Sequence, residues 1–102
     1  MYSLTVKSYK NRTETIKIIK NATNSPMGEI SNRIDNKQPI ITLDQYKNDN
    51  FKLLMDLYNQ LKAIETEAEF FDETYKEILQ IEVVNNYYKM FLEELNNIEA
   101  MH

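Results

Sequence analysis

The sequence predicts an α+β fold, a three-stranded antiparallel sheet in the order β-α-α-β-α-β with helices on one face, followed by a long C-terminal helix. Three observations lead to this prediction. One glycine and two prolines in 102 residues leave little material for elaborate loops and favour helix. Short apolar runs rich in β-branched and aromatic residues recur along the chain and indicate strands. The C-terminal part carries an apolar residue every three or four positions, which is the period of an amphipathic helix.

The first strand and the first helix are predicted at the N-terminus. Tyr2, Leu4 and Val6 alternate with polar residues, which is the pattern of a strand with one buried face. Residues 11–14 then supply capping side chains ahead of several isoleucines at helical spacing. We therefore expect a strand that begins at Tyr2 and a short helix that ends near Thr23.

A second short helix is predicted directly after the first. Ser25 is a candidate N-cap, and Pro26 occupies a position that suits the first turn of a helix. Met27, Ile30 and Ile34 follow at the spacing of one helical face. The two helices are expected to form a helical hairpin.

Two more strands and a third helix are predicted in the middle of the chain. Residues 40–43 form a short apolar run after Pro39, and residues 68–71 form a brief aromatic one. Between them, an amphipathic helix is indicated by six apolar positions at helical spacing: Phe51, Leu54, Leu57, Tyr58, Leu61 and Ile64.

The C-terminal helix is the most regular predicted element, running from about Glu73 to Ala100 with Asp72 as its cap. Its apolar residues form a heptad-like seam that Leu92 widens. Such a seam either packs on the domain's own sheet or pairs with another chain, and in both cases it must be buried. The seam and its flanking aromatic residues are Tyr75, Ile81, Val84, Tyr87, Tyr88, Phe91, Leu95 and Ile98.

Two units are expected, an α+β domain over residues 1–72 and the helix over residues 73–102. Residues 40–41 and 70–71 are apolar pairs within their strands, so both faces of the sheet are expected to be covered. The C-terminal helix, from this chain or from a partner, is the available cover. A homodimer through that helix is therefore one of the two arrangements that the sequence allows.

Composition excludes several classes of function. The chain has no cysteine, and its one histidine is the last residue, His102, so thiolate and histidine chemistry are not expected. The sole glycine leaves no phosphate-binding loop, and Ser25 has no activating base. Glu65, Glu67 and Glu69 are predicted to form a solvated acidic edge because no calcium-type loop accompanies them. We expect a non-catalytic chain with no cofactor and no metal.

Charge and hydropathy limit the partners and the location. The formal net charge is −4, with a balance of +4 over residues 1–37 and −8 over residues 38–102. The basic residues are dispersed, which disfavours nucleic-acid binding. No run approaches the ~20 apolar residues of a membrane span, and no secretory signal is visible at the N-terminus. A cytoplasmic protein that binds no membrane is expected.

The first seventy residues resemble the C-terminal domain of the bacterial ribosomal stalk protein L7/L12 and the related ClpS-like folds. The sequence Ile-Lys-Ile-Ile-Lys at 16–20, followed by Thr23, looks like that domain's first-helix pattern of I-K-x-V-R-x-x-T. Met27 and Glu29 fall where the family has its L-K-E, and Pro39 sits near the family's lead into the second strand. The resemblance covers residues 2–71.

The resemblance implies a helical hairpin that recruits a protein. Stalk domains use this hairpin to recruit translational GTPases, and the corresponding positions here are Ile16, Lys17, Lys20 and Met27. The family's glycine-rich helix junction and its basic residues on the second helix are not matched, and its dimerisation domain and hinge are absent. The resemblance therefore supports an interaction surface and disfavours a working stalk protein.

A protein-protein interaction module, acting as an adaptor or regulator of a larger complex, is the function these observations favour. The clustered aromatic residues of the predicted C-terminal helix are equally compatible with a core and with an interface. Two alternatives stay open. One is a small acidic inhibitor encoded by a phage or plasmid, an anti-defence or immunity protein that blocks a host enzyme. The other is an accessory subunit of an enzyme.

Overall fold

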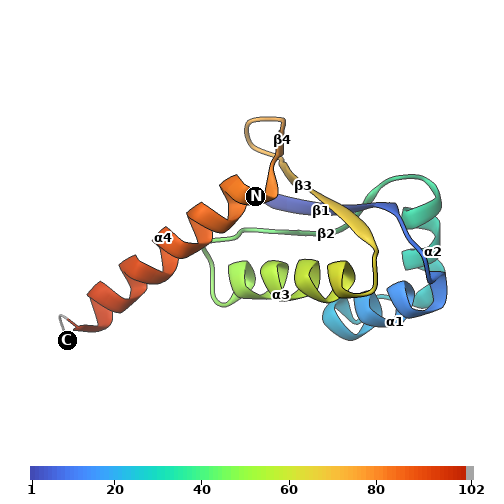
Figure 1. The fold of residues 1–102 in the computed structure, drawn as a ribbon, viewed down its shortest axis with the longest axis horizontal. Helices are drawn as coiled ribbons and strands as arrows, with labels where there is room; N and C mark the ends of the chain where they lie inside the picture. The colour runs from blue at the N-terminus through green and yellow to red at the C-terminus, as the bar shows by residue number, and fades with distance from the viewer. Residues whose placement is uncertain (101–102) are drawn as a thin grey trace.

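The structure is a computed structural model that describes residues 1–100, with side chains described for residues 1–97. Within that range it contains four strands and four helices (Figure 1), so the predicted α+β class is confirmed. The strands are β1 (Tyr2–Ser8), β2 (Pro39–Leu43), β3 (Glu67–Asp72) and β4 (Glu77–Leu79). The helices are α1 (Arg12–Thr23), α2 (Met27–Asp35), α3 (Asn50–Ala63) and α4 (Ile81–Ala100).

The strands form one antiparallel sheet in the order β2-β1-β3-β4, and α1, α2 and α3 lie on one side of it (Figure 1). The apolar residues of β1 are buried as the sequence predicts, because Tyr2, Leu4 and Val6 are at most 3% exposed, but Ser3 between them is buried as well. They face the buried side of α3, including Phe51 and Leu54. Burial of these large side chains stabilises the domain.

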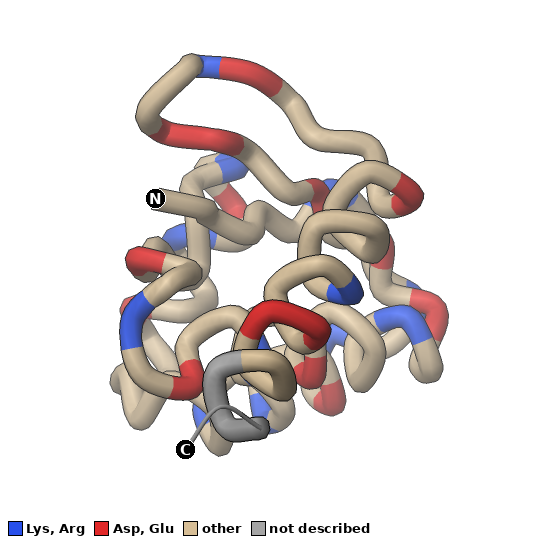
Figure 2. The backbone as a smooth tube through the Cα atoms, turned by 90° about the vertical axis from the view of Figure 1, so that its left-hand side faces the viewer, with Lys and Arg blue, Asp and Glu red and all other residues tan. Residues whose placement is uncertain are grey.

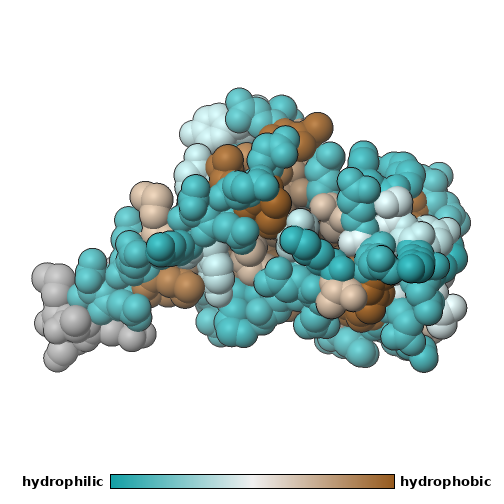
Figure 3. All heavy atoms as spheres, in the orientation of Figure 1, coloured by the Kyte–Doolittle hydropathy of each residue, from teal (hydrophilic) through white to brown (hydrophobic). Residues whose placement is uncertain are grey.

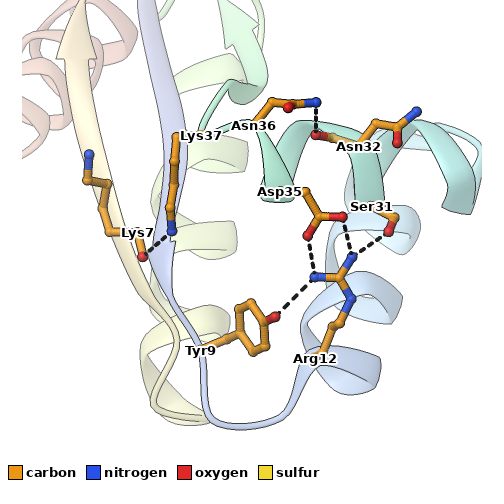
Figure 4. A network of polar contacts seen from close by, with 8 residues as sticks. All are labelled: Lys7, Tyr9, Arg12, Ser31, Asn32, Asp35, Asn36 and Lys37. Atoms are coloured by element: carbon orange, nitrogen blue, oxygen red, sulfur yellow. Dashed lines mark hydrogen bonds and ion pairs between the residues drawn. The ribbon is translucent and has the colours of Figure 1, made fainter.

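The helical hairpin is held by local hydrogen bonds and one arginine. Asn11 caps α1 by accepting a hydrogen bond at Oδ1 from the Glu14 N–H, and Asn24 ends α1 in the left-handed conformation. Arg12 on α1 donates to Oδ1 of Asp35 on α2 at 2.9 Å (Figure 4). The same guanidinium also donates to the hydroxyls of Ser31 and Tyr9. These contacts fix the angle between α1 and α2.

The fourth strand corrects the predicted three-stranded sheet and the predicted helix start. Asp72 does not cap a helix as predicted, because its Oδ1 accepts from the N–H groups of Thr74 (2.9 Å) and Tyr75 (3.2 Å) in the turn that follows β3. Lys76 then adopts a positive φ of 56°, which reverses the chain into β4. Because this hairpin joins β3 to β4, the predicted boundary between residues 72 and 73 falls inside it, and α4 begins only at Ile81.

Helix α4 starts against the core and then projects beyond it (Figure 1). Val84 is fully buried, and the rings of Tyr88 and Phe91 lie 5.0 Å and 5.6 Å from the ring of Phe51. Further along, Leu95 is 40% exposed. The first half of the seam is therefore part of the core, while the second half extends past it.

The second face of the sheet carries no helix within residues 1–100. Phe71 and Ile78 are paired on that face, and Ile78 is 58% exposed. The expected cover by α4 is not present, since α4 packs beside α3 through Phe51. Among the described helices, none has both the length and the apolar character needed to cross a membrane.

Candidate functional site

The interaction surface predicted on the helical hairpin is only partly available. Ile16 is 9% exposed and belongs to the core, so its side chain cannot meet a partner. Lys17 and Lys20 on α1 are exposed, and Met27 at the start of α2 is 45% exposed. Three of the four predicted positions therefore remain on the surface.

The predicted C-terminal seam divides into a core part and a surface part. Ile81, Val84, Tyr88 and Phe91 pack against the domain. Tyr87 and Leu95 are 44% and 40% exposed, and the side chain of Ile98 lies outside the described residues. Tyr75 belongs to the β3–β4 turn and is 75% exposed there.

A cavity of about 640 Å³ lies where four parts of the chain meet. We call it the hairpin cavity. Its walls come from the start of β1, the segment 44–46 after β2, the β3–β4 hairpin and the first half of α4. The sequence does not reveal this cavity, because residues 73–80 are predicted as helix and not as the strand and turn that form one wall.

Four tyrosines line the hairpin cavity: Tyr2, Tyr46, Tyr75 and Tyr87. Tyr2 is 3% exposed, while Tyr46 is 61% exposed. The ring of Tyr46 is nevertheless held from behind, with centroids 6.3 Å from Phe51 and 5.9 Å from Phe91. The cavity therefore combines one deeply buried phenol with three rings that remain accessible.

Short-range hydrogen bonds shape the segment that carries Gln45 and Tyr46. Oδ1 of Asp44 accepts from the Tyr46 N–H at 3.1 Å, and Asn50 Nδ2 donates to the Asp44 carbonyl at 3.0 Å. These bonds turn the chain so that Gln45 points inward and is only 6% exposed. Gln45 lines the cavity, and its Oε1 has no hydrogen-bond partner among the described residues.

The cavity is acidic. Asp44, Asp72 and Glu77 line it, and none of these carboxylates forms an ion pair within the described residues. No lysine or arginine is among the lining residues, although the N-terminal ammonium of Met1 lies there and donates to Thr74 Oγ1 at 3.1 Å. Figure 2 looks at this end of the molecule and shows acidic residues on both arms of the β3–β4 hairpin.

The environment of the cavity acts on the Tyr2 phenol. Burial, as the largest cause, and the neighbouring Tyr46 and Asp72 together raise the pKa of Tyr2 to about 12. All of these causes oppose a negative charge on the phenol oxygen. The bottom of the cavity is therefore a place where adding negative charge is unfavourable.

A second, smaller depression adjoins the hairpin cavity along α4. It measures about 100 Å³ and is lined by Tyr46, Tyr87, Met90, Phe91 and Glu94. We call it the helix cleft. Since Tyr46 and Tyr87 line both depressions, the two lie side by side, and we name them together the acidic-aromatic face. Figure 3 shows apolar side chains along the projecting helix between polar ones.

The acidic-aromatic face offers binding groups and few reactive ones. Its lining residues include no histidine, cysteine or lysine side chain. Within the described residues, no three His, Cys, Asp or Glu side chains are grouped in a way that could hold a metal ion. His102, the only histidine of the sequence, lies outside the described residues.

In comparisons with protein-family models, curated proteins and solved structures, none matches this chain. The resemblance to the stalk-protein domain therefore stays a prediction. The geometry of the acidic-aromatic face is the observation on which a function can be argued.

Proposed function

We propose that this chain is a non-catalytic protein-interaction module, an adaptor or regulator, that contacts its partner through the acidic-aromatic face. The observation that carries the proposal is the exposure of large side chains side by side at one end of the molecule. Tyr46 is 61% exposed, Tyr87 44% and Met90 57%. Aromatic residues and methionine are enriched at protein interfaces, and adjoining exposed apolar residues mark such sites.

The continuation of the α4 seam supports the same surface. Leu92 and Leu95 are 41% and 40% exposed and follow directly on the core residues of that helix. A helix that carries its apolar side beyond its own domain leaves that side in water unless a partner covers it. The helix cleft and the exposed leucines together provide a surface that a partner protein can bury.

The resemblance to stalk-protein domains points to a different surface, the helical hairpin with Lys17, Lys20 and Met27. Two methionines on helices allow a matched comparison, because Met90 lies on the acidic-aromatic face and Met27 lies on the helical hairpin of α1 and α2. Their exposed fractions are similar, 57% and 45%. Replacing either with glutamate adds one negative charge without emptying the core.

The experiment captures proteins from an extract of the producing cells on immobilised wild type, Met90→Glu and Met27→Glu, and then measures the purified partner by calorimetry. We expect Met90→Glu to weaken the complex by about tenfold or more, the equivalent of roughly 1.4 kcal/mol, and Met27→Glu to leave it unchanged. If only Met27→Glu weakens the complex, the partner binds the helical hairpin of α1 and α2 and not the acidic-aromatic face. A wild-type chain that captures nothing specific contradicts the proposal altogether.

A second candidate is an inhibitor, and the unpaired carboxylates favour it. Asp44, Asp72 and Glu77 present negative charge that complements a basic surface, and enzymes that act on nucleic acids have such surfaces. If the captured partner is an enzyme, its activity is measured with and without the chain. Inhibition at stoichiometric amounts supports the inhibitor, and unchanged turnover supports the adaptor.

A further inference from the structure

We propose that the hairpin cavity receives one cationic side chain, a lysine or an arginine, of the partner protein, so that this inference rests on the proposed function. Three independent features of the cavity carry it: its unbalanced charge, its tyrosine walls and its buried amide oxygen. The occupant is a side chain of a protein, because the helix cleft and the exposed Met90 and Leu95 beside the cavity provide apolar surface that a protein partner can bury.

The charge of the cavity selects a cation. Asp44, Asp72 and Glu77 contribute three carboxylates, and the N-terminal ammonium is the only positive group among the lining residues. Lys76 is the nearest basic residue in the hairpin, and it pairs with Glu73 at 3.4 Å. A net negative cavity with low-dielectric walls attracts a positive group and repels an anion.

The walls suit a cation better than a neutral polar group. The faces of tyrosine rings carry negative electrostatic potential, and they stabilise an ammonium or guanidinium within about 6 Å of the ring centroid by roughly 0.5–2 kcal/mol. Tyr46, Tyr75 and Tyr87 line the cavity and keep accessible surface there. A guanidinium can also stack on such a ring while its N–H groups reach carboxylates.

The buried amide of Gln45 calls for a hydrogen-bond donor. Its Oε1 is buried and accepts no hydrogen bond from the described residues. An unsatisfied buried acceptor is costly, so a donor that enters the cavity gains from pairing with the amide oxygen once the Gln45 side chain turns toward it. Lysine and arginine side chains carry only donors, three and five N–H bonds respectively, whereas an anion would add another acceptor.

The helix cleft identifies the neighbouring residue of the partner. It shares Tyr46 and Tyr87 with the cavity and adds Met90 and Phe91, so an apolar side chain fits beside the cation. The volumes differ accordingly, about 640 Å³ for the cavity and about 100 Å³ for the cleft. The expected recognition element is therefore a basic residue next to an apolar one.

The test titrates the isotope-labelled full chain with two capped dipeptides, arginyl-leucine and citrullyl-leucine, and follows amide chemical shifts. Citrulline keeps the shape of arginine and lacks its charge, so it is the matched control. We expect the arginine probe to shift the resonances of the Gln45 side-chain amide and of the backbone amides of Tyr75 and Tyr87. The affinity of that probe should fall with added salt. Equal shifts from both probes, or no shifts from either, overturn the inference.

Two variants confirm the location of the site. Glu77→Gln removes one carboxylate of the cavity without touching the turn that Asp72 supports, and we expect about a three- to tenfold loss of affinity for the arginine probe. Glu14→Gln on the exposed surface of α1 is the control and should bind as wild type. Unchanged binding by Glu77→Gln contradicts the assignment. Failure of the probe while partner capture still depends on Met90 removes the cavity inference and leaves the proposed function intact.

Discussion

Phe51 is the side chain on which three parts of the molecule meet. It is fully buried, and its ring lies 5.8 Å from Tyr2 on β1 and 5.0 Å from Tyr88 on α4. It also contacts the ring of Tyr46, which lines the candidate site. A single core residue thus links the sheet, the projecting helix and the tyrosine wall, because edge and tilted aromatic contacts fix the rings relative to one another.

Tyr2 lies next to Phe51 and gives the protein a pH dependence in the alkaline range. The pKa of Tyr2 rises from 10.0 to about 12 on folding, first because of burial. Between these two values the unfolded chain loses the phenolic proton while the folded chain keeps it, so stability falls as pH rises. Below pH 10 the contribution is constant. The loss amounts to on the order of 2 kcal/mol across the window.

Replacing Tyr2 with phenylalanine removes the titrating phenol and keeps the ring. We expect the Tyr2→Phe variant to lose less stability than wild type between about pH 9 and about pH 11. Urea unfolding at the two pH values measures this difference. The contributions of the other tyrosines cancel in the comparison because both proteins contain them. An equal decline in both proteins would contradict the assignment to Tyr2.

At the scale of elements, the local sequence pattern predicts the strands and helices that place an apolar side against the core. The apolar positions of β1 and the helical spacing of α3 each match the observed core, although β1 also buries Ser3, which the alternation does not predict. The segment 73–80 differs, because its pattern fits the start of a helix and also a turn and a strand. The deciding contacts are long-range: the Glu73 N–H donates to the Met1 carbonyl at 2.9 Å, and Ser3 Oγ donates to Glu73 Oε1 at 2.9 Å.

The site is less predictable than the fold for the same reason. Gln45 is a polar residue in a polar segment, and nothing local indicates that it is 6% exposed. Its burial depends on β1, the hairpin and α4 closing around it. Tyr87 could be assigned to the last helix from its spacing, but its neighbours across the cavity come from three other segments. Sequence patterns report one element at a time, and a cavity between elements leaves no such pattern.

Helix α4 should respond differently to charge in its two halves. Phe91 packs against the rings of Phe51 and Tyr46, so Phe91→Asp places a carboxylate beside the core and should cost about 2–4 kcal/mol. Leu95 lies one turn further and is 40% exposed, so Leu95→Asp should change stability by less than about 0.5 kcal/mol. Urea unfolding of both variants measures the contrast. A large loss with Leu95→Asp would mean that the distal half of α4 is buried in solution.

At the scale of the whole molecule, the projecting helix makes the shape anisotropic. The radius of gyration of the Cα atoms is 14.3 Å, and the principal extents are 45 × 26 × 21 Å. A compact domain of this length has a radius of about 13 Å. The difference arises because the distal part of α4 extends the longest dimension without adding to the core (Figure 1).

The charge distribution bears on whether two copies associate. The acidic-aromatic face collects carboxylates at the end from which α4 projects, and the chain as a whole has a net charge of −4. Two identical acidic faces repel each other, and this opposes a symmetric dimer through that surface. The same negative charge attracts a partner that carries basic residues and repels a second copy of the chain.

Small-angle X-ray scattering tests the elongated shape and the monomeric state in one experiment. We expect the mass of a monomer, 12.2 kDa, over a range of concentrations, and a radius of gyration at or above 14.3 Å. A variant that ends at Glu93 should be more compact, near about 13 Å, with an unchanged melting temperature, because none of the removed residues whose side chains are described, 94–97, belongs to the core. A full-length radius near that of the shortened variant would mean that α4 folds back onto the domain. A doubled mass would mean that the exposed seam pairs with a second copy, and the acidic-aromatic face would then serve self-association.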